Sequence, residues 1–260
     1  MSWVRRSETA ADTPADVTQF EVDERFRFLG RTFEEYRRMF GLDPTSILGR
    51  RILDCPGGPS SFTAVARSLG GDSLAVDPAY GPPVEALTDR CRVAIERTST
   101  QLAEKRDLFV WDEYVDPTDR ARYLRAASER FLADYAGHPS RYVSAALPSL
   151  PFPDDTFDLV LSANLLFLYD DRLDERFHRH ALAELCRVSR GELRVFPLAS
   201  LDCERSALVP PLRSALDEIA ADVELRTVPY EFQPGVSTAL VCSGLAGLTP
   251  TLGERDSQAL

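Results

Sequence analysis

A twelve-residue stretch, Arg51-Ile-Leu-Asp-Cys-Pro-Gly-Gly-Pro-Ser-Ser-Phe62, constrains the fold of this chain more than any other. It begins as a short apolar strand, continues with an acid and a Gly/Pro turn, and leads into a helix at Ser60 or Ser61. In open α/β sheets a strand that enters a helix through a tight glycine turn is a place where nucleotides bind. Glycine lets the backbone approach the ligand, and the helix start offers unpaired N–H groups. The stretch therefore predicts an α/β sheet with a ligand site at this turn.

A second acid strengthens this interpretation. Asp77 ends the next strand-like run, Ser73-Leu-Ala-Val-Asp77, and follows the first acid, Asp54, by about 20 residues. An acid at this distance can accept hydrogen bonds from both ribose hydroxyls of a nucleotide. The alternative is an acid that ends a strand or caps a helix without binding a ligand.

Length and composition favour one large α/β domain. The chain has 260 residues, of which 44% are hydrophobic, enough to bury a full core. It has no apolar run of the length that crosses a membrane, and its start, Met1-Ser-Trp-Val-Arg-Arg, lacks the apolar segment of a signal peptide. We therefore expect a cytoplasmic protein without a membrane partner. The five cysteines are scattered without a CxxC pair, which favours neither a disulfide framework nor a zinc site.

The charge of the chain argues against nonspecific binding of nucleic acid. The formal net charge is −11, with 41 acids against 30 bases, and such a surface repels phosphate backbones. Lys105 is the one lysine among the 30 bases. Two explanations of this bias stay open, a GC-rich genome and a salt-rich cytoplasm in which acidic, lysine-poor surfaces remain soluble.

The chain reads as alternating helices and strands. Residues 1–20 are polar and predict a flexible arm, and residues 247–260 predict a flexible tail. Apolar spacing predicts helices at 23–39, 60–69, 84–104, 174–189 and 207–221, with glycines at 41, 70 and 191 as stops. Strands are predicted at 52–53, 73–77, 142–146, 157–162, 192–197, 223–230 and 237–243. This order predicts an α/β, Rossmann-like, seven-stranded, mostly parallel sheet over residues 21–246, with helices on both faces and one antiparallel strand.

Residues 106–139 interrupt this alternation. Connections in α/β units are usually short, whereas this segment adds Pro117 and a further helical stretch. It is also rich in aromatic residues, which are Phe109, Trp111, Tyr114, Tyr123, Phe131 and Tyr135. We interpret it as a helical insertion that forms a lid over the site, with a permanently packed helix pair as the alternative.

Three stretches resemble class I S-adenosylmethionine-dependent methyltransferases: Ile52–Phe62, Leu74–Pro78 and Leu150–Ser162. The third is the most specific, because Leu-Pro-Phe-Pro-Asp-Asp-Thr-Phe-Asp-Leu-Val is similar to the family's run into its fourth strand. The resemblance extends over almost the whole chain, from residue 23 to residue 235. It implies S-adenosyl-L-methionine as the cofactor.

The resemblance also implies which residues bind that cofactor. The turn would hold the methionine part, largely through backbone groups, at Asp54, Cys55, Pro56, Gly57 and Gly58. Asp77 would accept from the ribose hydroxyls, and Pro78 would lie against the adenine. Asn164 and Leu165 would line the side where the methyl group leaves, and backbone groups at Ala146 or Leu147 would substitute for an acid that the family often places beside the adenine.

Two departures from the family pattern concern these residues. The usual turn is Asp-x-Gly-x-Gly-x-Gly, but here only Gly58 falls on a glycine position, and prolines at 56 and 59 fix φ and remove donors. The turn must therefore be a variant. The acid that often follows the third strand and bonds the adenine amino group is replaced by a position near Ala146.

The expected function is methyl transfer to a small-molecule acceptor. Methyl transfer requires mainly positioning, so no catalytic residue is assigned, and a general base is needed only for a poor nucleophile. His178 and His180 lie on different helix faces, so no metal site is predicted.

The alternatives to this function are an RNA or protein methyltransferase and a non-catalytic S-adenosylmethionine-binding protein. A nicotinamide dehydrogenase fits least, because the turn is not Gly-x-Gly-x-x-Gly. The residues after the fourth strand, Ser162-Ala-Asn-Leu-Leu166, also argue against DNA N-methylation.

Overall fold

The computed structural model describes residues 26–245 and residue 247, and these contain one seven-stranded sheet. The strand order is β3-β2-β1-β4-β5-β7-β6, in which β7 runs antiparallel to both of its neighbours and the other pairs are parallel. The strands are β1 (Arg51–Asp54), β2 (Asp72–Val76), β3 (Tyr142–Val143), β4 (Phe157–Ala163), β5 (Ser189–Phe196), β6 (Asp222–Thr227) and β7 (Thr238–Ser243). The predicted fold class is therefore confirmed, including the single antiparallel strand.

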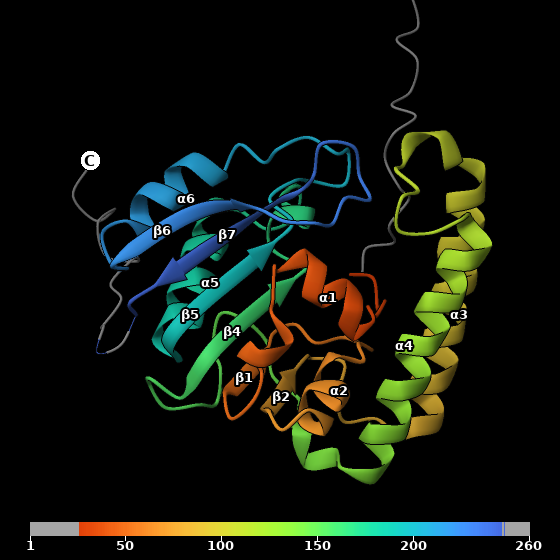
Figure 1. Cartoon of the computed structure of the whole chain (residues 1–260), viewed down its shortest axis with the longest axis horizontal. Helices are drawn as coiled ribbons and strands as arrows, with labels where there is room; N and C mark the ends of the chain where they lie inside the picture. The colour runs from red at the N-terminus through yellow and green to blue at the C-terminus, as the bar shows by residue number, and fades with distance from the viewer. Residues whose placement is uncertain (1–25, 246, 248–260) are drawn as a thin grey trace, which may run out of the picture.

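Helices cover both faces of this sheet (Figure 1). The helices are α1 (Phe33–Met39), α2 (Phe62–Ser68), α3 (Val84–Glu104), α4 (Pro117–Gly137), α5 (Glu175–Arg187) and α6 (Val209–Leu216). Successive strand residues point to opposite faces. Thus Leu53 and Val160 pack in one core cluster with α5 and α6, whereas Ile52 and Leu159 pack in another with α1 and α2. The central strands β1 and β4 are buried on both sides, as expected for parallel strands.

The helices α3 and α4 form a long hairpin beside the β3 edge of the sheet (Figure 1). Both have 21 residues, and their buried faces are apolar at helical spacing. Asp116 caps α4, because its side chain accepts a hydrogen bond from the amide of Asp119, and Pro117 occupies the first turn, where no donor is lost. The predicted insertion therefore supplies α4 and the connection that precedes it.

The helix predicted at 23–39 is correct only in its last part. Residues 26–32 are extended, α1 begins at Phe33, and residues 23–25 lie outside the described part of the chain. Thr32 and Glu35 form a capping box that starts the helix, with the Thr32 hydroxyl accepting from the Glu35 amide at 3.2 Å. A Cβ at Gly30 would lie 1.9 Å from the carbonyl oxygen of Pro59, so this segment fits closely against the glycine turn. That close approach, and the cap at Thr32, override the helical spacing of the apolar residues.

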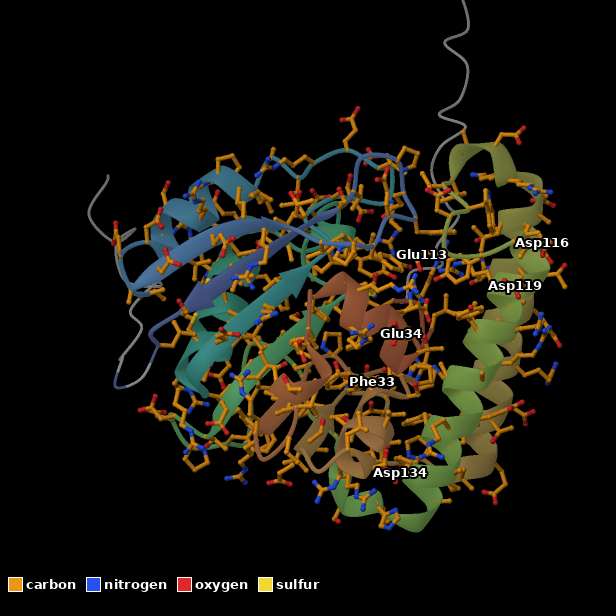
Figure 2. The ribbon with its side chains drawn as sticks, viewed as in Figure 1. Phe33, Glu34, Glu113, Asp116, Asp119 and Asp134 are labelled. Atoms are coloured by element: carbon orange, nitrogen blue, oxygen red, sulfur yellow. The ribbon has the colours of Figure 1, made fainter. Side chains whose placement is uncertain are left out.

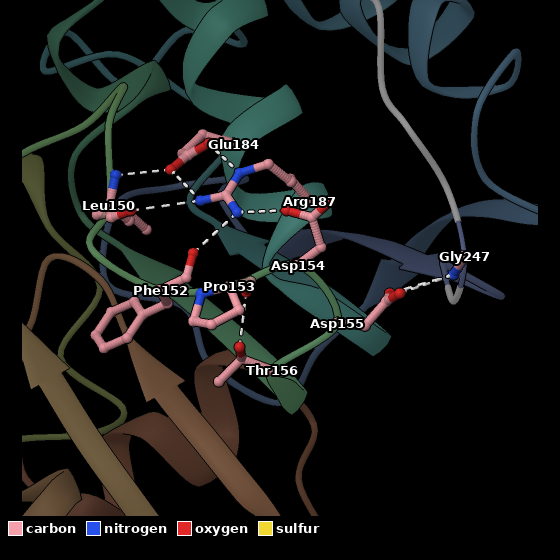
Figure 3. A network of polar contacts seen from close by, with 9 residues as sticks. All are labelled: Leu150, Phe152, Pro153, Asp154, Asp155, Thr156, Glu184, Arg187 and Gly247. Atoms are coloured by element: carbon pink, nitrogen blue, oxygen red, sulfur yellow. Dashed lines mark hydrogen bonds and ion pairs between the residues drawn. The ribbon is translucent and has the colours of Figure 1, made fainter.

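The turn before β4 contains the most specific sequence motif and is held by one arginine (Figure 3). Arg187, in the last turn of α5, donates to the carbonyl oxygens of Phe152 at 2.9 Å and Leu150 at 3.4 Å. It also pairs with Asp154 at 2.6 Å and with Glu184 at 2.7 Å. The run of prolines and acids is therefore a turn that is fixed to α5, and it sets where β4 begins.

Several predicted boundaries differ from the structure. Gly191 was predicted to end a helix but lies inside β5, where a Cβ would meet the carbonyl oxygen of Asp158 at 2.3 Å. Strand β3 is shorter than the predicted 142–146, and α6 is shorter than the predicted 207–221. The predicted arm at 1–20 lies outside the described residues, as does the predicted tail apart from residue 247.

Candidate active site

Two adjoining cavities open where β1, β2 and β4 end at their carboxyl termini. The larger has a volume of about 470 Å³ and the smaller a volume of about 110 Å³. Residues shared by both walls are Arg27, Pro56, Asp77, Asn164 and Tyr169. Open α/β sheets bind ligands at this edge, so the two cavities are the candidate site.

Asp77 lies between the cavities and is tied to the glycine turn. Its Oδ2 accepts a hydrogen bond from the amide of Gly58 at 3.0 Å, and its Oδ1 accepts from the amide of Ala79 at 2.8 Å. The residue is 9% exposed, and burial raises the pKa of its carboxyl group, while the two backbone hydrogen bonds oppose the shift. Because a carboxylate has about four acceptor positions, each oxygen retains acceptor capacity for a ligand hydroxyl.

The turn itself has a single left-handed residue. Gly58 has φ of +51°, a conformation that glycine adopts without strain. The carbonyl oxygen of Gly58 accepts a hydrogen bond from the Tyr80 hydroxyl at 2.6 Å, and the Gly57 amide donates to the carbonyl oxygen of Val76 at 2.8 Å. The Ser60 hydroxyl accepts from the Phe62 amide at the start of α2. The variant turn with its two prolines thus still forms a fixed backbone loop at the cavity wall.

Asp54 lies behind the turn and not in either cavity. It is 1% exposed, and its Oδ1 accepts a hydrogen bond from the Tyr36 hydroxyl at 3.0 Å. Its Oδ2 has no hydrogen-bond partner among the described residues. Burial raises the pKa of Asp54 well above its usual value, and the charge of Asp77 adds to this effect, whereas the hydrogen bond from Tyr36 opposes it. The Asp54 side chain therefore faces Tyr36, and the expected contact of this residue with a cofactor stays a prediction.

The other predicted site residues line the two cavities. The larger cavity is bounded by Cys55, Pro56, Asp77, Pro78, Ala146, Leu147, Asn164 and Leu165. The smaller cavity is bounded by Pro56, Gly57, Gly58, Asp77 and Asn164. Four separate parts of the sequence therefore meet at one edge of the sheet.

The extended segment before α1 supplies one wall of each cavity. Phe26 and Phe28 face the larger cavity, Leu29 and Arg31 face the smaller one, and Arg27 contacts both. This division follows the alternation of side chains in extended backbone. A helix, as expected from the sequence, would not have distributed these side chains between two cavities.

The insertion and a distant loop complete the smaller cavity. Phe109 and Arg120 come from the insertion, and Phe232 comes from the connection between β6 and β7. The rings of Phe109 and Phe232 stack with centroids 4.8 Å apart, and the Val110 amide donates to the carbonyl oxygen of Phe232. The segment before α4 also pairs with α1 through Glu113 and Arg38, and Figure 2 shows Glu113 between α1 and the upper end of α4. The insertion therefore forms a packed wall of the cavity.

Several charged and aromatic residues of the smaller cavity are not predictable from the sequence pattern. These are Arg27, Arg31, Tyr36, Arg120 and Phe232. Arg120 and Phe232 meet only through the tertiary fold. The alternation of Arg27, Leu29 and Arg31 was a visible signal of an extended segment, but it was outweighed by the helical spacing of the aromatic residues.

No helix among the described residues has the length and apolar character that crossing a membrane requires. In the same part of the chain, no group of three or more His, Cys, Asp or Glu residues is arranged to hold a metal ion.

Comparison with known proteins gives one clear sequence relative. No family model matches the chain. Among curated proteins, the uncharacterized protein MJ0045 of Methanocaldococcus jannaschii is 31% identical over 214 residues, which are 82% of this chain and 94% of that protein.

Among solved structures, the similar proteins are distant. Magnesium protoporphyrin IX methyltransferase from Synechocystis, with bound S-adenosylmethionine, aligns at 11% identity and a TM-score of 0.36 over 81% of this chain and 90% of its own. A SAM-dependent methyltransferase from Aquifex aeolicus aligns at 12% identity and a TM-score of 0.40 over 80% of this chain and 92% of its own. Because both TM-scores are below 0.5, the assignment of the fold rests on the strand order of the chain itself.

Proposed function

The chain belongs to the family of the uncharacterized protein MJ0045 of Methanocaldococcus jannaschii. From its two adjoining cavities we propose that it is a class I S-adenosylmethionine-dependent methyltransferase that acts on a small molecule. The observation that carries the proposal is the position of Asp77. It joins the second strand to the glycine turn and belongs to the walls of both cavities. The larger cavity then holds the nucleoside, and the smaller cavity holds the methionine end and the acceptor.

The chemistry of the larger cavity suits an adenosine. Asp77 offers carboxylate oxygens to the ribose hydroxyls, as acids at the end of a second strand do in nucleotide-binding sheets. Beyond it, Pro78, Ala146 and Leu147 form an apolar part of the cavity wall. Phe28 lines the same cavity, and the guanidinium of Arg90 lies 4.3 Å from the centroid of its ring. Apolar walls with a few polar groups are typical of small-molecule sites.

In this proposal, methyl transfer takes place where the smaller cavity meets the larger one. Asn164, directly after β4, belongs to both cavity walls and therefore marks the passage between nucleoside and acceptor. Asp77, Asn164 and the glycine turn would hold S-adenosylmethionine here. When bound, it would supply an electrophilic methyl group to the acceptor's lone pair, with the electron pair of the carbon–sulfur bond going to sulfur and a proton leaving the acceptor. The cavity walls orient the acceptor and exclude water, and such positioning accounts for much of the rate in this type of displacement.

The acceptor side has few groups able to remove a proton. Among the described residues that line the smaller cavity, Asp77 is the one carboxylate, and neither histidine nor cysteine is present. Tyr36 also lines it, but burial raises the pKa of its hydroxyl well above the usual value, so the group keeps its proton at neutral pH. An acceptor that needs little assistance from a general base is therefore favoured.

A calorimetric titration tests the proposal. The full chain is titrated separately with S-adenosylmethionine, S-adenosylhomocysteine and NADH. We expect the first two to bind at one site per chain and NADH to give no binding heat. Binding of NADH alone would indicate a dehydrogenase-type site, and absence of binding by all three would remove the proposed function.

A further inference from the structure

The smaller cavity contains an excess of positive charge. Arg27, Arg31 and the buried Arg120 all line it, whereas Asp77 is the one acid among the described residues of its wall. Glu35, outside the wall, lies 3.7 Å from Nε of Arg31 and therefore offsets part of the charge of that arginine. Buried charges are costly unless they are paired, so a cavity wall with several guanidinium groups suits an anionic ligand.

Arg120 is the least satisfied of the three. It is 3% exposed, and its Nε and Nη1 have no hydrogen-bond partner among the described residues. Its contacts are instead with aromatic faces, since its guanidinium lies 4.4 Å from the ring centroid of Phe232 and 5.5 Å from that of Tyr114. Stacking holds the guanidinium plane while its donors remain available, which is an arrangement suited to a planar or tetrahedral anion.

Two of the three arginines have a lowered pKa, whereas the pKa of Arg31 is raised, because its burial is outweighed by the charges of Tyr230 and Glu35. Burial lowers the pKa of Arg120, and the charge of Arg31 lowers it further. Burial also lowers the pKa of Arg27 to about 10, and the charges of Arg120 and Arg31 contribute to this shift. An anion in the cavity would relieve this repulsion.

Arg31 and Arg120 lie on different walls. The backbone of Arg31 is bound to the glycine turn, because its carbonyl oxygen accepts from the Ser61 amide and the Ser60 hydroxyl, both at 3.0 Å. This places Arg31 on the side of the cofactor's methionine end. Arg120 comes from the first turn of α4 and stacks on Phe232, so it belongs to the wall formed by the insertion and the β6–β7 connection.

We propose that the methyl acceptor is a small anionic molecule whose carboxylate or phosphate group binds Arg120, with an apolar or aromatic body against Phe109 and Phe232. This inference rests on the proposed methyltransferase function and names the substrate class of the same site. A guanidinium binds either group through two parallel hydrogen bonds. The stacked phenylalanines provide the apolar surface for the rest of the molecule.

The test uses chain that has first been saturated with S-adenosylhomocysteine. Benzoate, phenyl phosphate and the neutral isostere benzamide are then titrated as probes into wild type, Arg120→Met, Arg120→Lys and Arg125→Met. Arg125 is an exposed arginine of the same helix and serves as the control. We expect at least one of the two anions to bind wild type and Arg125→Met about tenfold or more tightly than benzamide. We expect Arg120→Met to lose this preference and Arg120→Lys to retain part of it.

The two anions distinguish a carboxylate acceptor from a phosphate acceptor. Equal binding of both anions and benzamide to wild type would overturn the inference, as would an anion preference that survives in Arg120→Met. Because S-adenosylhomocysteine is bound beforehand, its failure to bind would count against the proposed function and not against the acceptor class.

A second measurement separates the acceptor from the carboxylate of the cofactor. S-adenosylhomocysteine and methylthioadenosine, which lacks the amino-acid part, are titrated into wild type and Arg120→Met. We expect the ratio of the two affinities to be the same in both proteins. A selective loss of S-adenosylhomocysteine affinity in Arg120→Met would assign Arg120 to the cofactor and overturn its role in binding the acceptor. Retained affinity for methylthioadenosine also shows that the variant is folded.

Discussion

The amide nitrogen of Gly58 lies 3.0 Å from Oδ2 of Asp77, which joins the turn after β1 to the end of β2. This hydrogen bond unites the two sequence features that predicted a nucleotide site. It positions the Asp77 carboxylate between the two cavities and fixes the loop on which the proposed cofactor rests.

Replacement of Asp77 by alanine is expected to weaken binding of S-adenosylhomocysteine about tenfold or more. The variant removes a charged acceptor for the ribose hydroxyls, and hydrogen bonds to charged groups contribute roughly 1.5–3 kcal/mol. Calorimetry measures the dissociation constant. Asp72→Ala removes an exposed acid at the start of the same strand and is the matched control. An unchanged affinity in folded Asp77→Ala would exclude Asp77 as the ribose ligand.

Replacement of Gly30 by alanine is expected to destabilise the fold and weaken cofactor binding together. The added Cβ would lie 1.9 Å from the carbonyl oxygen of Pro59, so the extended segment must move away from the glycine turn. Overpacking of this kind costs about 1–3 kcal/mol. Urea unfolding and calorimetry measure the two effects. Gly137→Ala, where a Cβ meets no atom within 4 Å, should leave both values near those of wild type.

Replacement of Asp54 by asparagine is expected to raise the unfolding free energy relative to wild type, by an amount that grows as the pH rises above about 4. Burial raises the pKa of Asp54 well above its usual value, so the native state holds a proton that the unfolded chain has released. By linkage, the unfolding free energy of wild type then falls with rising pH, and the variant lacks this loss. Urea unfolding from pH 4 to pH 8 gives the difference between the two proteins, with Asp72→Asn as a control for removal of an exposed acid. A difference that does not change with pH would refute the raised pKa.

Binding of S-adenosylhomocysteine is expected to increase hydrogen-exchange protection in residues 106–116. This segment carries Phe109 on the cavity wall and Trp111, whose ring centroid lies 5.4 Å from that of Phe232. A lid that closes over a bound ligand would order both. Trp111 fluorescence in a Trp3→Phe background offers a second measurement. Equal protection with and without the ligand would leave the insertion as a permanently packed wall.

The parts of the site that depend on local sequence were predictable. A strand, an acid and a glycine turn are formed by neighbouring residues, so the stretch around Gly58 and the acid Asp77 could be assigned without a structure. The parallel strands of the sheet were also predictable, because a chain that alternates strands and helices forms parallel neighbouring strands. Asp54 shows the limit of this approach, because its neighbours predict a contact with a ligand but do not indicate the hydrogen bond that its carboxylate accepts from the Tyr36 hydroxyl.

The remaining parts depend on contacts between distant segments. Arg120 and Phe232 are separated by more than a hundred residues, and no local pattern indicates that they stack. The sequence gives no signal at Gly30 and predicts a helix end at Gly191, but each glycine lies where another backbone comes too close for a Cβ. At Gly30 the close approach goes with an extended segment where the apolar spacing predicts a helix. At Gly191 it goes with a strand, β5, that includes a glycine expected to end a helix.

The most direct test of the proposed function follows a labelled methyl group. The full chain is incubated with methyl-labelled S-adenosylmethionine and a metabolite extract, and the products are separated into protein, RNA and small-molecule fractions, the last of these on an anion-exchange column. Wild type and Asp72→Ala are compared with Asp77→Ala. We expect label in a small molecule that the column retains, in an amount that Asp77→Ala strongly reduces. Label in protein or RNA, or no enzyme-dependent transfer to any fraction, would contradict a small-molecule methyltransferase.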